Sequence, residues 1–75
     1  MSKESAGRVL KAARVKAGHD SRRSLADACG VSPGIIERIE RGEGDPNPAA
    51  VATILGVLGF PVGPWWEEWS REVAP

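Results

Sequence analysis

The sequence predicts an all-α fold, a compact bundle of four to five helices in one domain. Apolar residues recur at spacings of three and four along the chain, and no useful length alternates with the two-residue period of a strand. Glycines and the pairs Ser-Pro and Asn-Pro interrupt this pattern, at points where helices are expected to end and begin. The chain has 75 residues, of which 41% are hydrophobic and 27% charged, an ordinary globular composition. These observations favour short helices around one small core.

The first two helices are expected at residues 5–17 and 22–29. Gly18 ends the first helix, because glycine readily adopts the left-handed conformation that follows a helix. Ser21 precedes the second helix as an N-cap, whose hydroxyl can accept a hydrogen bond from a free backbone N–H. A helical wheel turns the following residues inward: Ala6, Val9, Leu10, Ala13 and Ala17 in the first helix, and Leu25, Ala26 and Cys29 in the second.

The third helix is expected at residues 33–41, after the start signal Ser32-Pro33. Its apolar side consists of Ile35, Ile36 and Ile39. Its opposite side, which we expect to face solvent or a partner, carries Pro33, Gly34, Glu37, Arg38 and Arg41.

Two further helices are expected at residues 48–58 and 64–73. Asn47 caps the fourth helix, whose inward residues are Val51, Ile54, Leu55 and Leu58. Pro64 opens the fifth helix, which is amphipathic and rich in tryptophan. One arc of this helix holds Trp65, Trp66, Trp69 and Val73.

The net charge of the chain is zero, but the charge is unevenly distributed. Residues 1–42 contain nine Lys or Arg and five Asp or Glu, a net charge of +4. Residues 43–75 contain one Arg and five Asp or Glu, a net charge of −4. The N-terminal half is therefore the candidate for binding an anionic partner.

Composition argues against several other classes of protein. Cys29 is the single cysteine, so no internal disulfide can form, and with the single His19 it cannot build a four-ligand zinc site without carboxylates. No stretch approaches a membrane span and no leader opens the chain, so we expect a soluble, cytoplasmic protein. We find no nucleophile beside a base, no phosphate-binding glycine loop and no metal cluster. We therefore expect no enzymatic activity, no metal and no cofactor.

The second and third helices, joined by residues 29–32, form a helix-turn-helix unit at residues 22–41. From Gly7 to Gly59 the sequence resembles the Cro/repressor-type (XRE-like) helix-turn-helix regulators of bacteria and phages. The residues that carry the resemblance are Gly7, Leu10, Arg14, Ala17-Gly18, Leu25-Ala26, Gly30-Val31-Ser32, Ile36, Arg38-Ile39-Glu40-Arg41-Gly42 and the segment from Pro48 to Leu58-Gly59. Residues 1–62 would then form the helix-turn-helix domain, and residues 63–75 an added C-terminal helix of the same domain.

The resemblance implies a lambda-repressor-like DNA-binding domain that binds operator DNA, usually as a dimer. On this basis the base-facing residues are expected to be Pro33, Gly34, Glu37 and Arg38. Phosphate contacts are expected from Ser21, Arg22, Arg23, Ser32 and Arg41. Arg22 stands where the family usually has a glutamine. In the family, the residues matching Arg14 and Glu40 form an ion pair, so we expect the same pair here as a structural feature.

The tryptophan-rich helix has two interpretations. It can fold back and complete the core of its own chain, or it can form a dimer or partner interface, where tryptophan is enriched. The candidate interface residues are Phe60, Trp65, Trp66, Trp69 and Val73. Both interpretations can hold together, with Trp65 and Trp69 inward and Trp66 at a partner. We favour a homodimer formed through this helix.

The leading functional hypothesis is a sequence-specific DNA-binding transcriptional regulator, repressor-like, with double-stranded DNA as its partner. The alternative is a protein-interaction module on the same scaffold, similar to an antitoxin, an antirepressor or a protein that binds a sigma factor. Proline and glycine have no side-chain hydrogen-bonding group, so the start of the third helix at Pro33-Gly34 favours the alternative.

Overall fold

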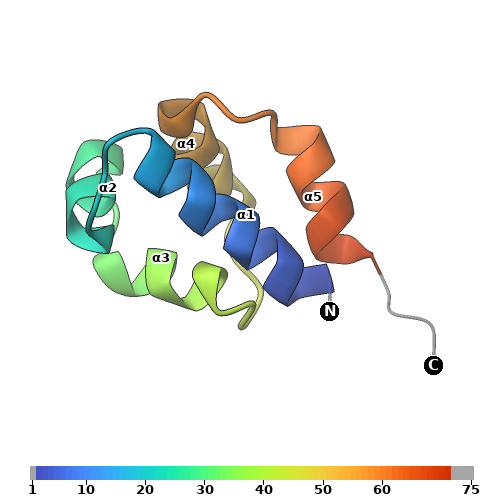
Figure 1. Ribbon diagram of the computed structural model, residues 1–75. Coiled ribbons are helices and arrows are strands. Elements are labelled where there is room, and N and C mark those ends of the chain that lie inside the picture. The colour runs from blue at the N-terminus through green and yellow to red at the C-terminus, as the bar shows by residue number, and fades with distance from the viewer. Residues whose placement is uncertain (1, 72–75) are drawn as a thin grey trace.

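The computed structural model describes residues 2–71, and in that part of the chain it contains five helices and no strand (Figure 1). The helices are α1 (Ser2–Lys16), α2 (Arg22–Cys29), α3 (Pro33–Glu40), α4 (Pro48–Leu58) and α5 (Val62–Ser70). The predicted all-α bundle is therefore confirmed. α1 crosses the middle of the molecule and contacts α3, α4 and α5, while α2 packs against α3 and α4 (Figure 1).

The second and fourth helices have the predicted bounds, and the other three differ at their ends. α1 starts three residues earlier than expected, and Ala17, predicted to face inward as its last residue, lies exposed in the turn after it. α5 starts two residues before Pro64 and ends at Ser70, with Arg71 already in an extended conformation. Proline is tolerated within the first turn because N–H groups there have no intrahelical acceptor. Pro64 therefore lies inside the helix that it was expected to open.

One core holds the bundle together, and α1 and α5 supply much of it. Its buried apolar residues are Ala6, Leu10, Leu25, Ala26, Ile36, Ile39, Val51, Ile54, Leu55, Trp65 and Trp69. Ile35, predicted to face inward, is instead 38% exposed. The buried residues of α3 are Ile36, Ile39 and Glu40, and Ile35 lies at the edge of the side that they form.

The burial of the tryptophans shows which of them face the core of their own chain. Trp65 is 1% exposed and Trp69 is 4% exposed, and their rings stack with centroids 5.2 Å apart. The indole N–H of Trp65 donates a hydrogen bond of 3.0 Å to the carbonyl of Ala6 in α1. Trp65 and Trp69 therefore lie inward, as in the combined interpretation, and as candidate interface residues they are corrected, because their own chain already covers them. A partner contact of Trp66 stays a prediction.

The other candidate interface residues have different positions. Phe60 and Trp66 are partly buried and pack against the same core. The edge of the Trp66 ring meets Trp65 at an interplanar angle of 76°. Val73 lies outside the described residues. Phe60 and Trp66 are therefore the two candidates that keep part of their surface exposed.

Gly7 allows α1 to lie directly against the end of α3. A Cβ atom at this position would lie 2.4 and 2.6 Å from the backbone carbonyl oxygens of Glu40 and Ile39. Real Cβ atoms essentially never come within 3.0 Å of such an atom. Only glycine can be accommodated there without moving one of the helices. The contact sets the distance between α1 and the helix-turn-helix unit.

Candidate nucleic-acid interface

The turn between α2 and α3 is short and well defined. Gly30 ends α2 in the left-handed conformation, with φ 72° and ψ 30°, and its N–H donates to the carbonyl of Ala26. Val31 packs partly buried against the core and anchors the turn. Ser32 occupies the N-cap position of α3, and Pro33 begins the helix. The sequence thus builds the turn from an αL glycine, an apolar anchor and a proline start.

The two serines expected to contact phosphate differ in how their hydroxyl groups are used. Ser21 caps α2, because its hydroxyl accepts a hydrogen bond of 3.1 Å from the N–H of Ser24. Ser32 makes no side-chain cap hydrogen bond to α3. Both residues are exposed. The N-cap prediction for Ser21 is confirmed, and the phosphate contacts of both stay predictions.

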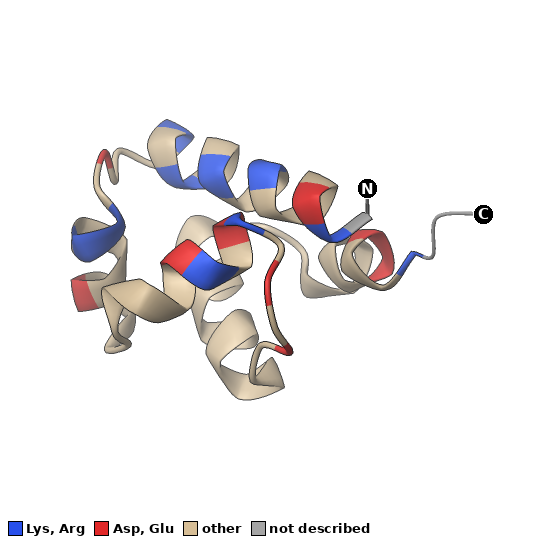
Figure 2. Ribbon diagram, turned by 90° about the horizontal axis from the view of Figure 1, so that it is seen from below, with Lys and Arg blue, Asp and Glu red and all other residues tan. Residues whose placement is uncertain are grey.

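The outer side of α3 carries the residues expected to face DNA bases. Pro33, Gly34 and Arg38 are exposed, and Glu37 is partly buried among charged neighbours. Arg41, the residue that follows α3, is also exposed. Figure 2 shows this helix at the front of the molecule, with acidic and basic residues alternating along its second half. The structure therefore brings the predicted base-facing residues together on one accessible surface.

The carboxylate of Glu37 lies between two arginines. Its Oε2 is 3.7 Å from Nη1 of Arg22 and 3.6 Å from Nη2 of Arg41. The three side chains are between about one third and three fifths exposed, so solvent screens these ion pairs. Even so, the two arginines partly neutralise the carboxylate of Glu37, which would otherwise repel a DNA phosphate.

Glu40 forms a buried junction between three helices. Its Oε2 accepts a hydrogen bond of 2.7 Å from Nε of Arg14 in α1, and its Oε1 accepts one of 2.8 Å from Nε of Arg22 in α2. Nη1 of Arg14 also donates to the carbonyl of His19 in the α1–α2 turn, at 2.8 Å. The expected ion pair between Arg14 and Glu40 is present, and each oxygen of the carboxylate has its own arginine.

The sequence prediction missed this second partner of Glu40. Arg22 was expected at a phosphate, but its Nε is used by Glu40 and a terminal nitrogen faces Glu37. Helical wheels place Glu40 at the edge of the inner side of α3, but they do not tell which residue of another helix lies opposite. The one available clue was the arginine at a position where the family usually has glutamine.

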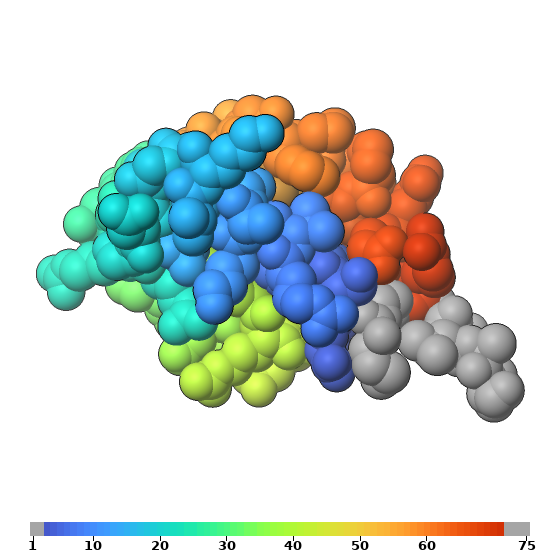
Figure 3. Space-filling model, in the orientation of Figure 1, coloured from blue at the N-terminus to red at the C-terminus, as the bar shows by residue number. Residues whose placement is uncertain are grey.

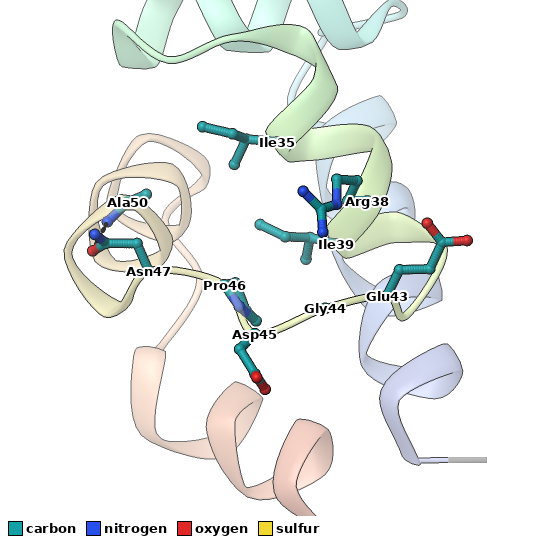
Figure 4. A pocket seen from close by; sticks show the side chains of 9 residues that line it. All are labelled: Ile35, Arg38, Ile39, Glu43, Gly44, Asp45, Pro46, Asn47 and Ala50. Atoms are coloured by element: carbon teal, nitrogen blue, oxygen red, sulfur yellow. Dashed lines mark hydrogen bonds between the residues drawn. The ribbon is translucent and has the colours of Figure 1, made fainter.

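Arg38 lies on the side of α3 that faces the following loop. Its guanidinium passes over Gly44, where an added Cβ would be 3.0 Å from Nη2. Together with Ile35 and Ile39 it borders a shallow cavity of about 150 Å³ between α3, residues 43–47 and the start of α4. In Figure 4, Arg38 points into this space, while the carboxylates of Glu43 and Asp45 point away from it. Arg38 forms no ion pair within residues 2–71, so its guanidinium can still turn toward a base.

Most of the positive charge of the N-terminal half lies outside the helix-turn-helix unit. Residues 22–41 contain four arginines and three acidic residues, a net charge of +1, and with the following loop, residues 21–47 have a net charge of −1. Residues 2–16, which form α1, contain five Lys or Arg and one Glu, a net charge of +4. Figure 2 shows the basic residues on successive turns of α1.

His19 and Cys29, the single histidine and the single cysteine of the chain, both contact other parts of the bundle. Nδ1 of His19 lies 2.8 Å from the hydroxyl of Ser24, which ties the α1–α2 turn to α2. Cys29 packs partly buried against the core, and burial raises the pKa of its thiol. Residues 2–71 contain no group of three or more His, Cys, Asp or Glu that could hold a metal ion. No helix in this part of the chain is long and apolar enough to span a membrane.

Comparison of the sequence with known protein families identifies its family. A model of the helix-turn-helix domain matches residues 5–64, most of the chain. The chain belongs to this helix-turn-helix family. The match includes all of α2, α3 and α4 and ends at Pro64, so the three tryptophans of α5 lie beyond it. No curated protein matches the sequence.

Proposed function

We propose that the protein is a sequence-specific DNA-binding transcriptional regulator of the Cro/repressor (XRE-like) type. In this proposal α3 enters the major groove of operator DNA, and the bound protein represses transcription by occupying the operator. The protein is a binding protein, without enzymatic activity. The observation that carries the proposal is a complete helix-turn-helix unit whose second helix presents an accessible outer side, within a helix-turn-helix domain.

Arg38 is the best candidate for direct base recognition. Its guanidinium is exposed and can donate two parallel hydrogen bonds to guanine, the most frequent specific contact in the major groove. Pro33 and Gly34 offer no side-chain hydrogen bond, but they allow the start of α3 to approach DNA closely. Ser32, whose hydroxyl is not used in a cap, lies beside that start and can donate to a phosphate.

The proposal is tested by selecting binding sites from random double-stranded DNA and measuring affinity by fluorescence anisotropy. Arg38→Ala should weaken binding to the selected site by about 1–3 kcal/mol, the value of one good base contact, and leave binding to random DNA nearly unchanged. Arg71→Ala is the matched control, because Arg71 is exposed at the end of α5 and pairs with Glu68 there. Equal losses on both kinds of DNA would move Arg38 from the bases to the backbone.

The protein-interaction module stays the second candidate. The net charge of −1 on residues 21–47 favours it, because non-specific DNA binding depends on neutralising phosphates. If selection enriches no DNA sequence and the protein retains no duplex at low salt, the regulator proposal fails. The protein-interaction module would then be the better account.

A dimer, which the resemblance implies, would need contacts other than the stacked tryptophans. Trp65 and Trp69 are covered by their own chain, whereas Phe60 and Trp66 retain part of their surface. Sedimentation of the full chain with and without the selected duplex measures the number of protein chains that bind. Two chains on one duplex, spaced about 34 Å apart, would agree with dimeric binding on successive major grooves.

A further inference from the structure

α1 carries a net charge of +4, whereas the helix-turn-helix unit at residues 22–41 has a net charge of +1. Arg8 and Lys11 are both exposed, and neither forms an ion pair with any residue in the described part of the chain. One acidic residue, Glu4, lies at the N-terminal end of the same side. In Figure 3, α1 occupies the middle of the visible face, between α3 below it and α5 beside it.

Lys11 lies on the flank of α1 that is next to α3. Residues three or four positions apart are neighbours on a helix surface, and Lys11 is four residues after Gly7 and three before Arg14. Gly7 touches the backbone at the end of α3, and Arg14 bonds to Glu40 of α3. Arg8 is three residues before Lys11 and extends the positive surface away from α3.

Two of the four arginines in the helix-turn-helix unit are engaged by glutamates. Arg22 is held by Glu40 and faces Glu37, and Arg41 also pairs with Glu37. The positive charges of these two arginines are therefore largely offset by Glu37 and Glu40 beside the outer side of α3. Arg23 and Arg38 are exposed and form no ion pair within residues 2–71, but the unit has a net charge of only +1. Much of the phosphate attraction would therefore have to come from another part of the molecule.

The dimensions of DNA place α1 close to a phosphate backbone. The major groove is about 12 Å wide, and a helix inside it has one sugar-phosphate strand on each side. Packed helices lie about 8–10 Å apart, so long side chains on the near flank of a helix beside α3 can reach the strand that borders the groove. α1 is such a neighbour, because Gly7 brings its backbone against α3.

We propose that Arg8 and Lys11 of α1 contact phosphates of the strand that flanks α3. They supply a large part of the sequence-independent attraction for DNA, while Arg22 holds α2 and α3 together through Glu40. This inference rests on the proposed DNA-binding function and names the surface that contacts the DNA backbone.

The test compares two variants that each remove two positive charges. R8Q/K11Q changes the proposed surface. K16Q/R71Q is the matched control. Lys16 lies beside Leu58 and Phe60 at a hollow on the protein surface, and Arg71 pairs with Glu68 at the end of α5. All four residues are exposed, so both variants are expected to fold. Their folding is checked by thermal unfolding before binding to a random-sequence duplex is measured over a range of salt concentrations.

R8Q/K11Q should reduce the slope of log affinity against log salt by about two, because each phosphate contact contributes about 0.9 to that slope. K16Q/R71Q, with the same net charge, should keep a slope close to that of the unmodified protein. Equal slopes for the two variants would overturn the inference and leave DNA binding itself intact. If the unmodified protein retains no duplex at any salt concentration, the proposed function fails and this inference fails with it.

Discussion

α1 is joined to the rest of the molecule in two chemically different ways. On one side it meets α5 through apolar contacts, with Trp65 fully buried and hydrogen-bonded to the carbonyl of Ala6. On the other side it meets α2 and α3 through charged groups, with Arg14 and Arg22 each bonded to one oxygen of Glu40. The tryptophans of the apolar junction lie beyond the matched family domain, whereas all three residues of the charged junction lie within it.

The two junctions contribute differently: the apolar one mainly to the stability of the fold, and the charged one mainly to the orientation of α3. Apolar burial is roughly proportional to the area removed from water and has little preference for direction. A carboxylate between two guanidinium groups requires defined distances and angles, although replacing such a group by apolar residues is often neutral for stability. The tryptophans therefore mainly close the small core, whereas Glu40 fixes the angle at which α3 is presented. Within the described residues no buried side-chain nitrogen or oxygen lacks a hydrogen-bond partner, so the charged junction is fully satisfied.

The largest effect is expected at the apolar junction. Trp65→Ala should lower the free energy of unfolding by about 3–5 kcal/mol, because it removes a fully buried ring and leaves a cavity beside Trp69. Urea denaturation followed by far-UV circular dichroism measures the loss. Trp66→Ala is the control, since Trp66 is only partly buried and should cost clearly less. Similar losses for both variants would contradict the inward assignment of Trp65.

The second-largest effect is expected at the charged junction. Glu40→Gln leaves the guanidinium of Arg14, which is 5% exposed, without a carboxylate, and should lower the free energy of unfolding by about 3 kcal/mol. Glu68→Gln, which removes the partner of exposed Arg71, should cost about 0.5 kcal/mol or less. Denaturation of the two variants side by side checks this. A loss at Glu40 no greater than at Glu68 would mean that the buried junction does not constrain the fold.

The smallest of the three effects concerns the distance between α1 and α3. Gly7→Ala should lower the free energy of unfolding by about 1–3 kcal/mol, because its new methyl group would overlap the backbone of Glu40 and Ile39. Gly56→Ala in α4 has open space around it and should raise stability by up to about 1 kcal/mol through helix propensity. Opposite signs for these two substitutions, measured by thermal unfolding, would support close contact at Gly7. A stabilising Gly7→Ala would refute it.

Several features of the candidate site could be predicted from short stretches of sequence. The bounds of α2 and α4, the cap at Ser21 and the turn at Gly30 follow from residue preferences that act over four or five positions. The set of residues on the outer side of α3 follows from helical periodicity. The ion pair between Arg14 and Glu40 was expected from the family resemblance, and a helical wheel alone would not have paired them.

The interactions between helices could not be predicted in the same way. The second bond of Glu40, to Arg22, joins residues 18 positions apart, and the hydrogen bond of Trp65 to Ala6 joins residues 59 positions apart. Neither partner is visible in the local pattern of either segment. The same limit explains why the tryptophan arc suggested a dimer interface, since an apolar arc shows that a helix is covered but not by which chain.

The sequence by itself determined where the chain forms helices, both ends of α2 and α4, and which sides of the helices are apolar, because these properties depend on neighbouring residues. Only the tertiary structure decided that α5 covers its own core, that Arg22 pairs with Glu40, and that the exposed Arg8 and Lys11 of α1 lie near α3. Each of these depends on how helices distant in sequence pack against one another, and that packing is set by the volumes and charges of the whole chain at once.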